Sequence, residues 1–238
     1  MAASDPTPLR ILHSVRAPVG GIIRHILDLA NGQAARGHHV GILADSLTGG
    51  ERAETAFAEI APRMALGIHR IAIRREPHPA DVFALRAFTK RVGALAPDVL
   101  HGHGAKAGAF VRLTRAAPTA LRVYTPHGGS LHYSPSTAKG AFYAILERAL
   151  MNRTDLFLFE SAFSRDTYQR VIGTPRHLVR CVHNGVTPEE FEPVARDADA
   201  TDLAFVGEFR HIKGADLMLS ALAEIRADIR ALEAETED

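Results

Sequence analysis

Short apolar runs alternate with longer amphipathic segments along most of this chain, and no other feature limits its possible folds as strongly. Apolar runs bounded by turn residues predict strands at residues 9–15, 38–44, 68–73, 97–101, 121–125, 156–159 and 178–182. The segments between them repeat apolar residues at helical spacing, as in Glu51–Ile60 and Asp81–Leu95. This alternation predicts an α/β fold, a doubly wound Rossmann-like sheet of parallel strands with helices on both faces.

The chain is expected to hold one complete domain and the beginning of another. Residues 1–8 lack the basic-then-apolar order of a signal peptide and are predicted to be a flexible leader. Residues 9–187 form the predicted Rossmann-like domain, and the acidic segment 188–201 is predicted to be a linker. Residues 202–238 offer a strand at 203–206 and one long helix, too little to bury a core, so an incomplete second domain is expected.

Composition narrows the classes of partner. Lys and Arg number 28 against 27 Asp and Glu, which gives no reason to expect nucleic acid as a partner. The single cysteine, Cys181, excludes an internal disulfide and fits a reducing cytoplasm. No run approaches the roughly 20 apolar residues of a membrane span. We therefore expect a cytoplasmic protein whose short basic clusters allow at most peripheral contact with the inner membrane face.

Glycine-rich loops follow several predicted strands, and ligands of open parallel sheets bind at the carboxyl ends of the strands. Gly20 and Gly21 stand between the first strand and a helix, where they would admit a phosphate or a sugar close to the backbone. A plain tight turn explains them equally well. A dinucleotide site is disfavoured because the Gly-x-Gly-x-x-Gly order is missing, although Asp45 stands where a ribose-binding acid would.

Two histidines lie near the fourth predicted strand. His101 and His103 are two residues apart, a spacing that lets two side chains on one strand share a metal ion. No acidic or histidine partner follows them closely in the sequence, so we expect no metal, with His101 at the strand end and His103 in the loop. His103 and Lys106 are instead candidate contacts for a sugar or a phosphate.

Three further candidates follow later strands. His127 lies in a Pro-His-Gly-Gly loop after strand 121–125, which would hold the imidazole over the binding edge, ready to exchange a hydrogen bond with a sugar hydroxyl. Glu160 and Asn184 are candidate substrate-binding residues. Each has a purely structural alternative: a loop-ending histidine, a helix cap formed by Ser161, and a turn at Asn184.

The stretch from Asp202 to Leu222 has the composition of an anion site. An apolar run is followed by a glycine, a basic loop with Arg210 and Lys213, and a helix. Free N–H groups at a helix start and fixed cations both favour a phosphate group.

Taken in order, these pieces resemble glycosyltransferase family 4, a group of retaining enzymes with the GT-B fold. The resemblance covers nearly the whole chain and rests on Val19–Gly21, Asp28–Ala30, Ala35–His38, Asp98–Lys106, Thr125–Gly128, Phe159–Ser161, Asn184–Val186 and Phe205–Gly214. It implies that the first domain binds the acceptor and that residues from 202 onward begin the donor-binding domain.

The resemblance also implies a reaction and roles for residues. A sugar passes from a nucleotide diphosphate sugar to a saccharide or lipid-linked acceptor with retained anomeric configuration, without a cofactor or an obligatory metal. Arg210 and Lys213 would hold the donor diphosphate, with Gly20 and Gly21 facing it. His127 matches the family's cleft histidine and is the expected catalytic residue.

The sequence departs from the family after Leu222, where no further strand or paired-glutamate motif follows. We therefore expect a truncated enzyme, inactive or weakly active alone, or one half of a split enzyme whose donor domain comes from a separate chain. The alternative is a non-catalytic α/β module that binds a saccharide or a partner chain. A dehydrogenase or hydrolase fits less well, because the glycine and nucleophile patterns of those classes are missing.

Overall fold

A computed structural model describes residues 7–201, 203–207, 209 and 211–236. The chain divides into two compact units, residues 1–186 and 187–238. The strands of the first unit are β1 Arg10–Val15, β2 His39–Asp45, β3 Gly67–Ile71, β4 Val99–His103, β5 Leu121–Thr125, β6 Leu156–Phe159 and β7 Leu178–Cys181. Its α-helices are α1 Gly20–Ala35, α2 Gly50–Ile60, α3 Asp81–Leu95, α4 Ala105–Leu113, α5 Ala138–Met151 and α6 Ala162–Val171, with short 3₁₀ turns η1 Ala61–Arg63 and η2 Gly129–His132.

The seven strands form one parallel sheet in the order β3-β2-β1-β4-β5-β6-β7. This confirms the predicted doubly wound α/β fold. The order reverses between β1 and β4, so the chain runs outward on each side of this pair. A crevice opens at such a switch point because the connections after the two strands leave in opposite directions, and ligands of open α/β sheets bind there.

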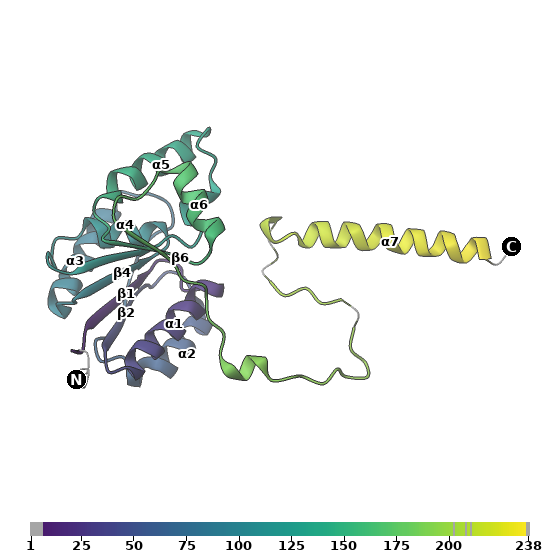
Figure 1. Cartoon of the computed structure of the whole chain (residues 1–238), viewed down its shortest axis with the longest axis horizontal. Coiled ribbons are helices and arrows are strands. Elements are labelled where there is room, and N and C mark those ends of the chain that lie inside the picture. The colour runs from purple at the N-terminus through teal and green to yellow at the C-terminus, as the bar shows by residue number, and fades with distance from the viewer. Residues whose placement is uncertain (1–6, 202, 208, 210, 237–238) are drawn as a thin grey trace, which may run out of the picture. The chain divides into compact units, whose positions relative to one another are not determined.

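Helices cover both faces of the sheet (Figure 1). Successive strand residues point to opposite faces, so Leu43 joins a core under α3 and α4 while Ile42 joins a core under α1 and α2. A third apolar cluster lies where β5 and β6 meet α5 and α6 and contains Tyr124 and Phe157. Strands buried on both faces explain why the sequence shows continuous apolar runs.

Two glycines let α4 approach the sheet. A Cβ added at Gly102 of β4 would lie 2.6 Å from the Cα atom of Gly108 in α4, and one at Gly108 would lie 2.3 Å from Cε2 of Tyr124. Neither distance is compatible with a side chain. The helix therefore packs directly on β4 and β5 and fixes the carboxyl ends of both strands.

A buried ion pair joins α4 to α5 beneath β5. Arg112 Nη1 lies 2.8 Å from Glu147 Oε2, and both side chains are almost fully buried. The Tyr124 hydroxyl donates to Glu147 Oε1 at 2.8 Å, and the guanidinium lies 4.0 Å above the Tyr124 ring. The carboxylate thus has a charged partner and a hydrogen-bonding one, which a buried charge requires. This network supports the loop that follows β5.

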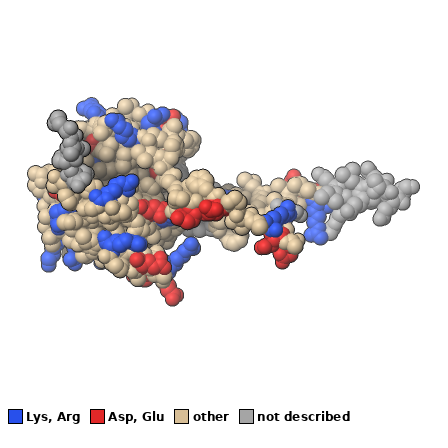
Figure 2. Space-filling model, turned by 60° about the horizontal axis from the view of Figure 1, so that its bottom comes forward, with Lys and Arg blue, Asp and Glu red and all other residues tan. Residues whose placement is uncertain are grey.

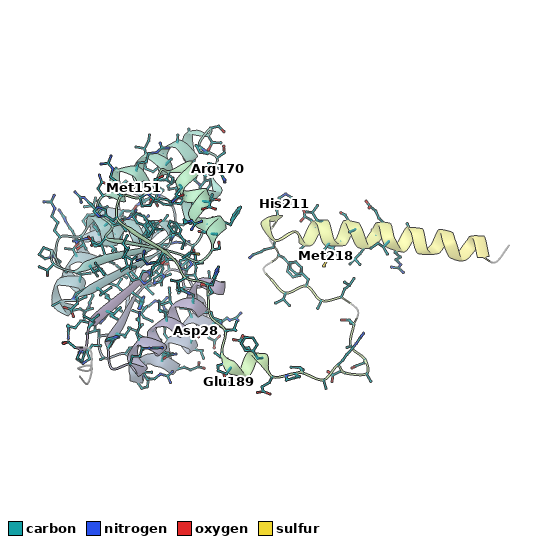
Figure 3. All side chains as sticks on the ribbon, viewed as in Figure 1. Asp28, Met151, Arg170, Glu189, His211 and Met218 are labelled. Carbon is teal, nitrogen blue, oxygen red and sulfur yellow. The ribbon has the colours of Figure 1, made fainter. Side chains whose placement is uncertain are left out.

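The described residues of the second unit form two 3₁₀ turns, η3 Pro188–Phe191 and η4 His211–Lys213, and one helix, α7 Ala215–Thr236. His211 lies on η4 and Met218 on α7 (Figure 3). The strand predicted at 203–206 is wrong, because the structure shows irregular backbone there. A strand needs a neighbour to take up its N–H and C=O groups, and the described residues of this unit contain no other strand.

Charged side chains are distributed over the first unit. On the face shown in Figure 2, Lys and Arg side chains lie apart from one another and are interspersed with acidic and uncharged residues. In the described part of the chain, no helix combines the length and the apolar character that crossing a bilayer requires.

Candidate active site

The register of two central strands brings three histidines together. His13 of β1 lies opposite His101 of β4, and His103 follows two residues later on the same strand. Leu12 and Leu100 point to the α3 and α4 side, so the three histidines point to the other side, under α1. All three are buried. The sequence prediction that His103 lies in a loop is wrong, since β4 runs to His103 and pairs with β1 and β5 on either side.

Helix α1 adds two polar side chains to this cluster. Gln33 Oε1 lies 2.8 Å from Nε2 of His13. The ring of His25, one turn after the start of the helix, has its centroid 5.7 Å from that of His103 and 5.2 Å from that of His127. Asp28, three residues further along α1 (Figure 3), is exposed and pairs with Arg24.

One continuous hydrogen-bonded chain passes through the site, and we call it the histidine chain. It runs from Gln33 to His13, His103, His127 and Glu160. His13 Nδ1 lies 3.0 Å from His103 Nε2, and His103 Nδ1 lies 3.0 Å from His127 Nε2. His127 Nδ1 lies 2.7 Å from Glu160 Oε1. The chain therefore connects α1 to the loops after β5 and β6 across the switch point of the sheet.

His127 is held by its backbone as well as its ring. Its φ angle is +51°, in the left-handed region that non-glycine residues rarely adopt. Both ring nitrogens are already engaged, by His103 and Glu160. Local strain of this kind persists where the surroundings fix one conformation, and it is frequent at functional sites. A ligand at His127 thus meets a ring whose orientation is set in advance.

Burial determines the charge of the inner histidines. It lowers the pKa of His13 to about 4, because the surroundings cannot solvate the charged form. Burial, reinforced by the neighbouring histidines, also lowers the pKa of His101 and His103 well below the usual value. These three imidazoles are neutral at neutral pH.

The outer groups respond differently. Burial, followed by the nearby His127, lowers the pKa of His25. Glu160 and a side-chain hydrogen bond to Asn184 act in the opposite direction and raise it, but by less. Burial alone would raise the pKa of Glu160, but its hydrogen bond and charge interaction with His127 outweigh this, and the net pKa is lowered. Glu160 is therefore a carboxylate at neutral pH, beside the mouth of the cluster.

The loops after β6 and β7 complete the mouth. His183 Nδ1 lies 3.0 Å from the carbonyl oxygen of Glu160, which ties the two loops together. Asn184 is exposed and hydrogen-bonds His25. Ser161 caps α6, accepting from the Ser164 N–H at 3.1 Å. The capping alternative is thus correct for Ser161, while Glu160 beside it joins the histidine chain.

Other predicted site residues lie apart from the histidine chain. Lys106 Nζ lies 2.7 Å from Asp81 Oδ2 and 2.8 Å from the carbonyl oxygen of Glu76, and among the described contacts none joins it to the cluster. Gly20 and Gly21 begin α1, and a Cβ added at either would meet no atom within 4 Å. The space above this helix start is therefore open, and phosphate binding there stays a prediction.

Asp45 has a structural role. Its Oδ1 accepts from the Ile73 N–H at 2.7 Å and its Oδ2 accepts from the Thr48 hydroxyl at 2.8 Å. The side chain is fully buried, and its two oxygens hold the loop after β2 at Thr48 and the segment after β3 at Ile73. Lys213 lies exposed on η4 of the second unit, and Arg210 lies outside the described residues. Their assignment to the donor diphosphate stays a prediction.

Sequence reasoning missed His13 and His25. No partner for His101 and His103 follows closely in the sequence, but β1, α1 and the loop after β5 bring partners that are distant in sequence. One signal was available. His13 interrupts the apolar run 9–15, and a polar side chain inside a buried strand requires a partner.

The described sheet and its helices superpose on part of solved GT-B glycosyltransferases. The sucrose-phosphate synthase of Thermosynechococcus elongatus superposes with a TM-score of 0.66 at 19% identity, over 91% of this chain and 60% of that one. Anabaena HepE, solved with UDP and glucose, superposes with a TM-score of 0.55 at 16% identity, over 76% of this chain and 48% of that one. Both are GT-B glycosyltransferases.

The chain belongs to Glycosyltransferase Family 4, whose sequence profile matches residues 19–190. A Klebsiella pneumoniae relative, an uncharacterized 41.2 kDa protein in the cps region, is 26% identical over 141 residues, which are 52% of this chain and 38% of the relative. The chain spans less than two thirds of the length of each of these proteins.

Proposed function

We propose that this protein takes part in sugar transfer from a nucleotide diphosphate sugar to a saccharide or lipid-linked acceptor, with retention of anomeric configuration. Membership of Glycosyltransferase Family 4 supports the reaction class. The observation that carries the proposal is the histidine chain, which ends in His127 and Glu160 at the switch point of the sheet. An imidazole and a carboxylate side by side offer hydrogen-bonding atoms that suit the hydroxyl groups of a sugar.

Glu160, His25 and Asn184 are the groups through which the cluster reaches a ligand. The Glu160 side chain is 17% exposed, whereas the His127 side chain is only 6% exposed. The carboxylate can accept from a sugar hydroxyl while it still holds His127, because each of its oxygens has two lone pairs. His25 is half-buried and Asn184 exposed, so both can contribute donors or acceptors to the same ligand.

We assign the donor diphosphate to Arg210 and Lys213 of the second unit, and we treat the open backbone at Gly20 and Gly21 of the first unit as a separate candidate for phosphate binding. Fixed cations would stabilise the charge that develops on the departing diphosphate, so we propose no metal ion or other cofactor at the diphosphate itself. A lipid-linked acceptor would bring the protein into peripheral contact with the inner membrane face. A further proposed partner is a separate protein chain that supplies a donor-binding domain.

A binding and transfer assay tests the function. The chain is incubated with a set of nucleotide diphosphate sugars and saccharide or lipid-linked acceptors, saccharide binding is followed by ligand-observed NMR, and product anomers are read from their coupling constants. Glu160→Ala should abolish saccharide binding, whereas His177→Ala, at an exposed position, should leave it unchanged. An inverted product would contradict retention. Saccharide binding without any transfer would favour the alternative function, a non-catalytic binding module.

A further inference from the structure

Two sets of three histidines place nitrogen atoms close enough to bind a metal ion. One set is His13, His101 and His103, and the other is His25, His103 and His127. Within each set the nitrogens lie within 4.8 Å of one another. A nitrogen that binds a metal needs a free lone pair. The positions of the protons on the ring nitrogens of the histidine chain therefore show which of the two sets can bind an ion.

At the outer end of the chain, Glu160 fixes the tautomer of His127. The carboxylate can only accept, so the proton of a neutral His127 lies on Nδ1, 2.7 Å from Glu160 Oε1. Nε2 of His127 then carries a lone pair. That lone pair points at Nδ1 of His103, 3.0 Å away.

At the inner end, Gln33 fixes the tautomers of His13 and His103. The amide oxygen of Gln33 accepts the proton on His13 Nε2, so His13 Nδ1 must accept from Nε2 of His103. A neutral His103 then has its lone pair on Nδ1. Two lone pairs consequently face each other at 3.0 Å between His103 and His127. With the Gln33 amide in this orientation, the contact is repulsive unless a cation lies beside it, and the cation is either one extra proton or a metal ion.

We propose that His25, His103 and His127 bind a divalent transition-metal ion of the zinc type. Zn–N bonds of about 2.0–2.1 Å in tetrahedral geometry require ligand nitrogens about 3.4 Å apart, so the His103–His127 contact must open by a few tenths of an ångström and the two rings must turn until both lone pairs point at the ion. His25 closes the third side of the triangle from α1. Three protein ligands leave the fourth position to water or to a substrate oxygen, as in catalytic zinc sites.

The surroundings of this set suit a metal better than those of the inner set. Glu160 receives the second ring N–H of His127, and His13 receives that of His103, which is the outer-shell arrangement that orients metal-binding histidines. His25 is half-buried, so an ion can enter. In the inner set all residues are buried, and Nε2 of His101 is already bonded to the Thr125 hydroxyl at 2.8 Å.

Metal titration of the full chain tests the site. Chelator-treated protein, purified without a histidine tag, is titrated with Co²⁺ and then with Zn²⁺ by absorption and calorimetry. We expect one ion per chain, the visible absorption of four-coordinate Co²⁺, and its loss when Zn²⁺ is added. His25→Ala should weaken binding at least about tenfold, and Glu160→Gln about 10–100-fold. His177→Ala, an exposed control, should bind as the unchanged chain does.

Three results would overturn the assignment. If no metal binds, the close contact between His103 and His127 must have another explanation. That explanation is either one shared proton between the two rings or the opposite orientation of the Gln33 amide. Binding unaffected by His25→Ala but lost in His101→Gln would place the ion in the inner set. Binding equally weakened by His177→Ala would indicate non-specific surface association. None of these measurements contains a sugar, so their failure is distinct from failure of the proposed function.

Discussion

Acid should destabilise this fold through His13 well before its carboxylates are protonated. The pKa of His13 in the folded state is about 4, against the ordinary value of 6.5 for histidine, because burial disfavours the imidazolium. A group whose pKa is lowered by folding contributes stability above its unfolded pKa and loses it as the pH falls toward the folded value. The stability contributed by His13 is therefore complete above pH 6.5 and declines between pH 6.5 and about 4.

The two pKa values set the magnitude. At 1.36 kcal/mol for each pKa unit, complete protonation would cost about 3.4 kcal/mol, and lowering the pH from about 7.5 to about 5 would cost about 2 kcal/mol. His101 and His103 are shifted in the same direction and add to this loss. A domain of ordinary stability has about 5–15 kcal/mol in total, so the effect is large enough to measure.

Urea unfolding followed by circular dichroism, in the presence of a chelator, measures the effect at both pH values. His13→Gln removes the titrating group, so its stability should fall about 2 kcal/mol less over the same interval than that of the unchanged chain. His177→Gln, at an exposed site, should keep the full pH dependence. Equal pH dependence in the His13→Gln variant and the unchanged chain would refute the view that burial keeps His13 neutral.

Three further outcomes test the packing around the site. Arg112→Met should lower the free energy of unfolding by about 3–5 kcal/mol in urea, because Glu147 keeps a buried charge without its cation; a loss below about 1 kcal/mol would contradict the buried pair. Gly108→Ala should cost about 1–3 kcal/mol by the same assay, since its Cβ collides with Tyr124, and an unchanged midpoint would contradict the close approach of α4. Cys181 is exposed, so a thiol reagent should label the folded chain, and labelling only after denaturation would show that β7 is covered.

Periodicity predicted the first unit well because its elements are long and locally consistent. The expected ranges of α2 and α3 match those in the structure within one residue, and those of β5 and β6 coincide with it. Strand β4 was misplaced by two residues at each end, because an apolar pattern does not extend over His101-Gly-His103. These residues become strand through pairing with β1 and β5, and the sequence carries no local sign of that register.

The candidate site was only partly predictable. His127 and Glu160 could be chosen because both follow strands, where ligands of parallel sheets bind. The contact between His127 and Glu160 depends on the adjacency of β5 and β6 and on the left-handed backbone conformation of His127. Neither feature can be predicted from a local sequence pattern. His25 could not be distinguished from the other polar residues of an amphipathic helix, because its role depends on where α1 lies relative to His103.

The location of a bound sugar tests the central claim most directly. Protein whose histidines carry ¹⁵N can be titrated with saccharides and nucleotide diphosphate sugars while long-range ¹H–¹⁵N spectra follow each imidazole. If the mouth of the histidine chain is the binding site, the His25 and His127 signals should shift with saturation, while those of His38 and His177, both outside it, stay constant. Saturable sugar binding that leaves His25 and His127 unchanged would contradict the account.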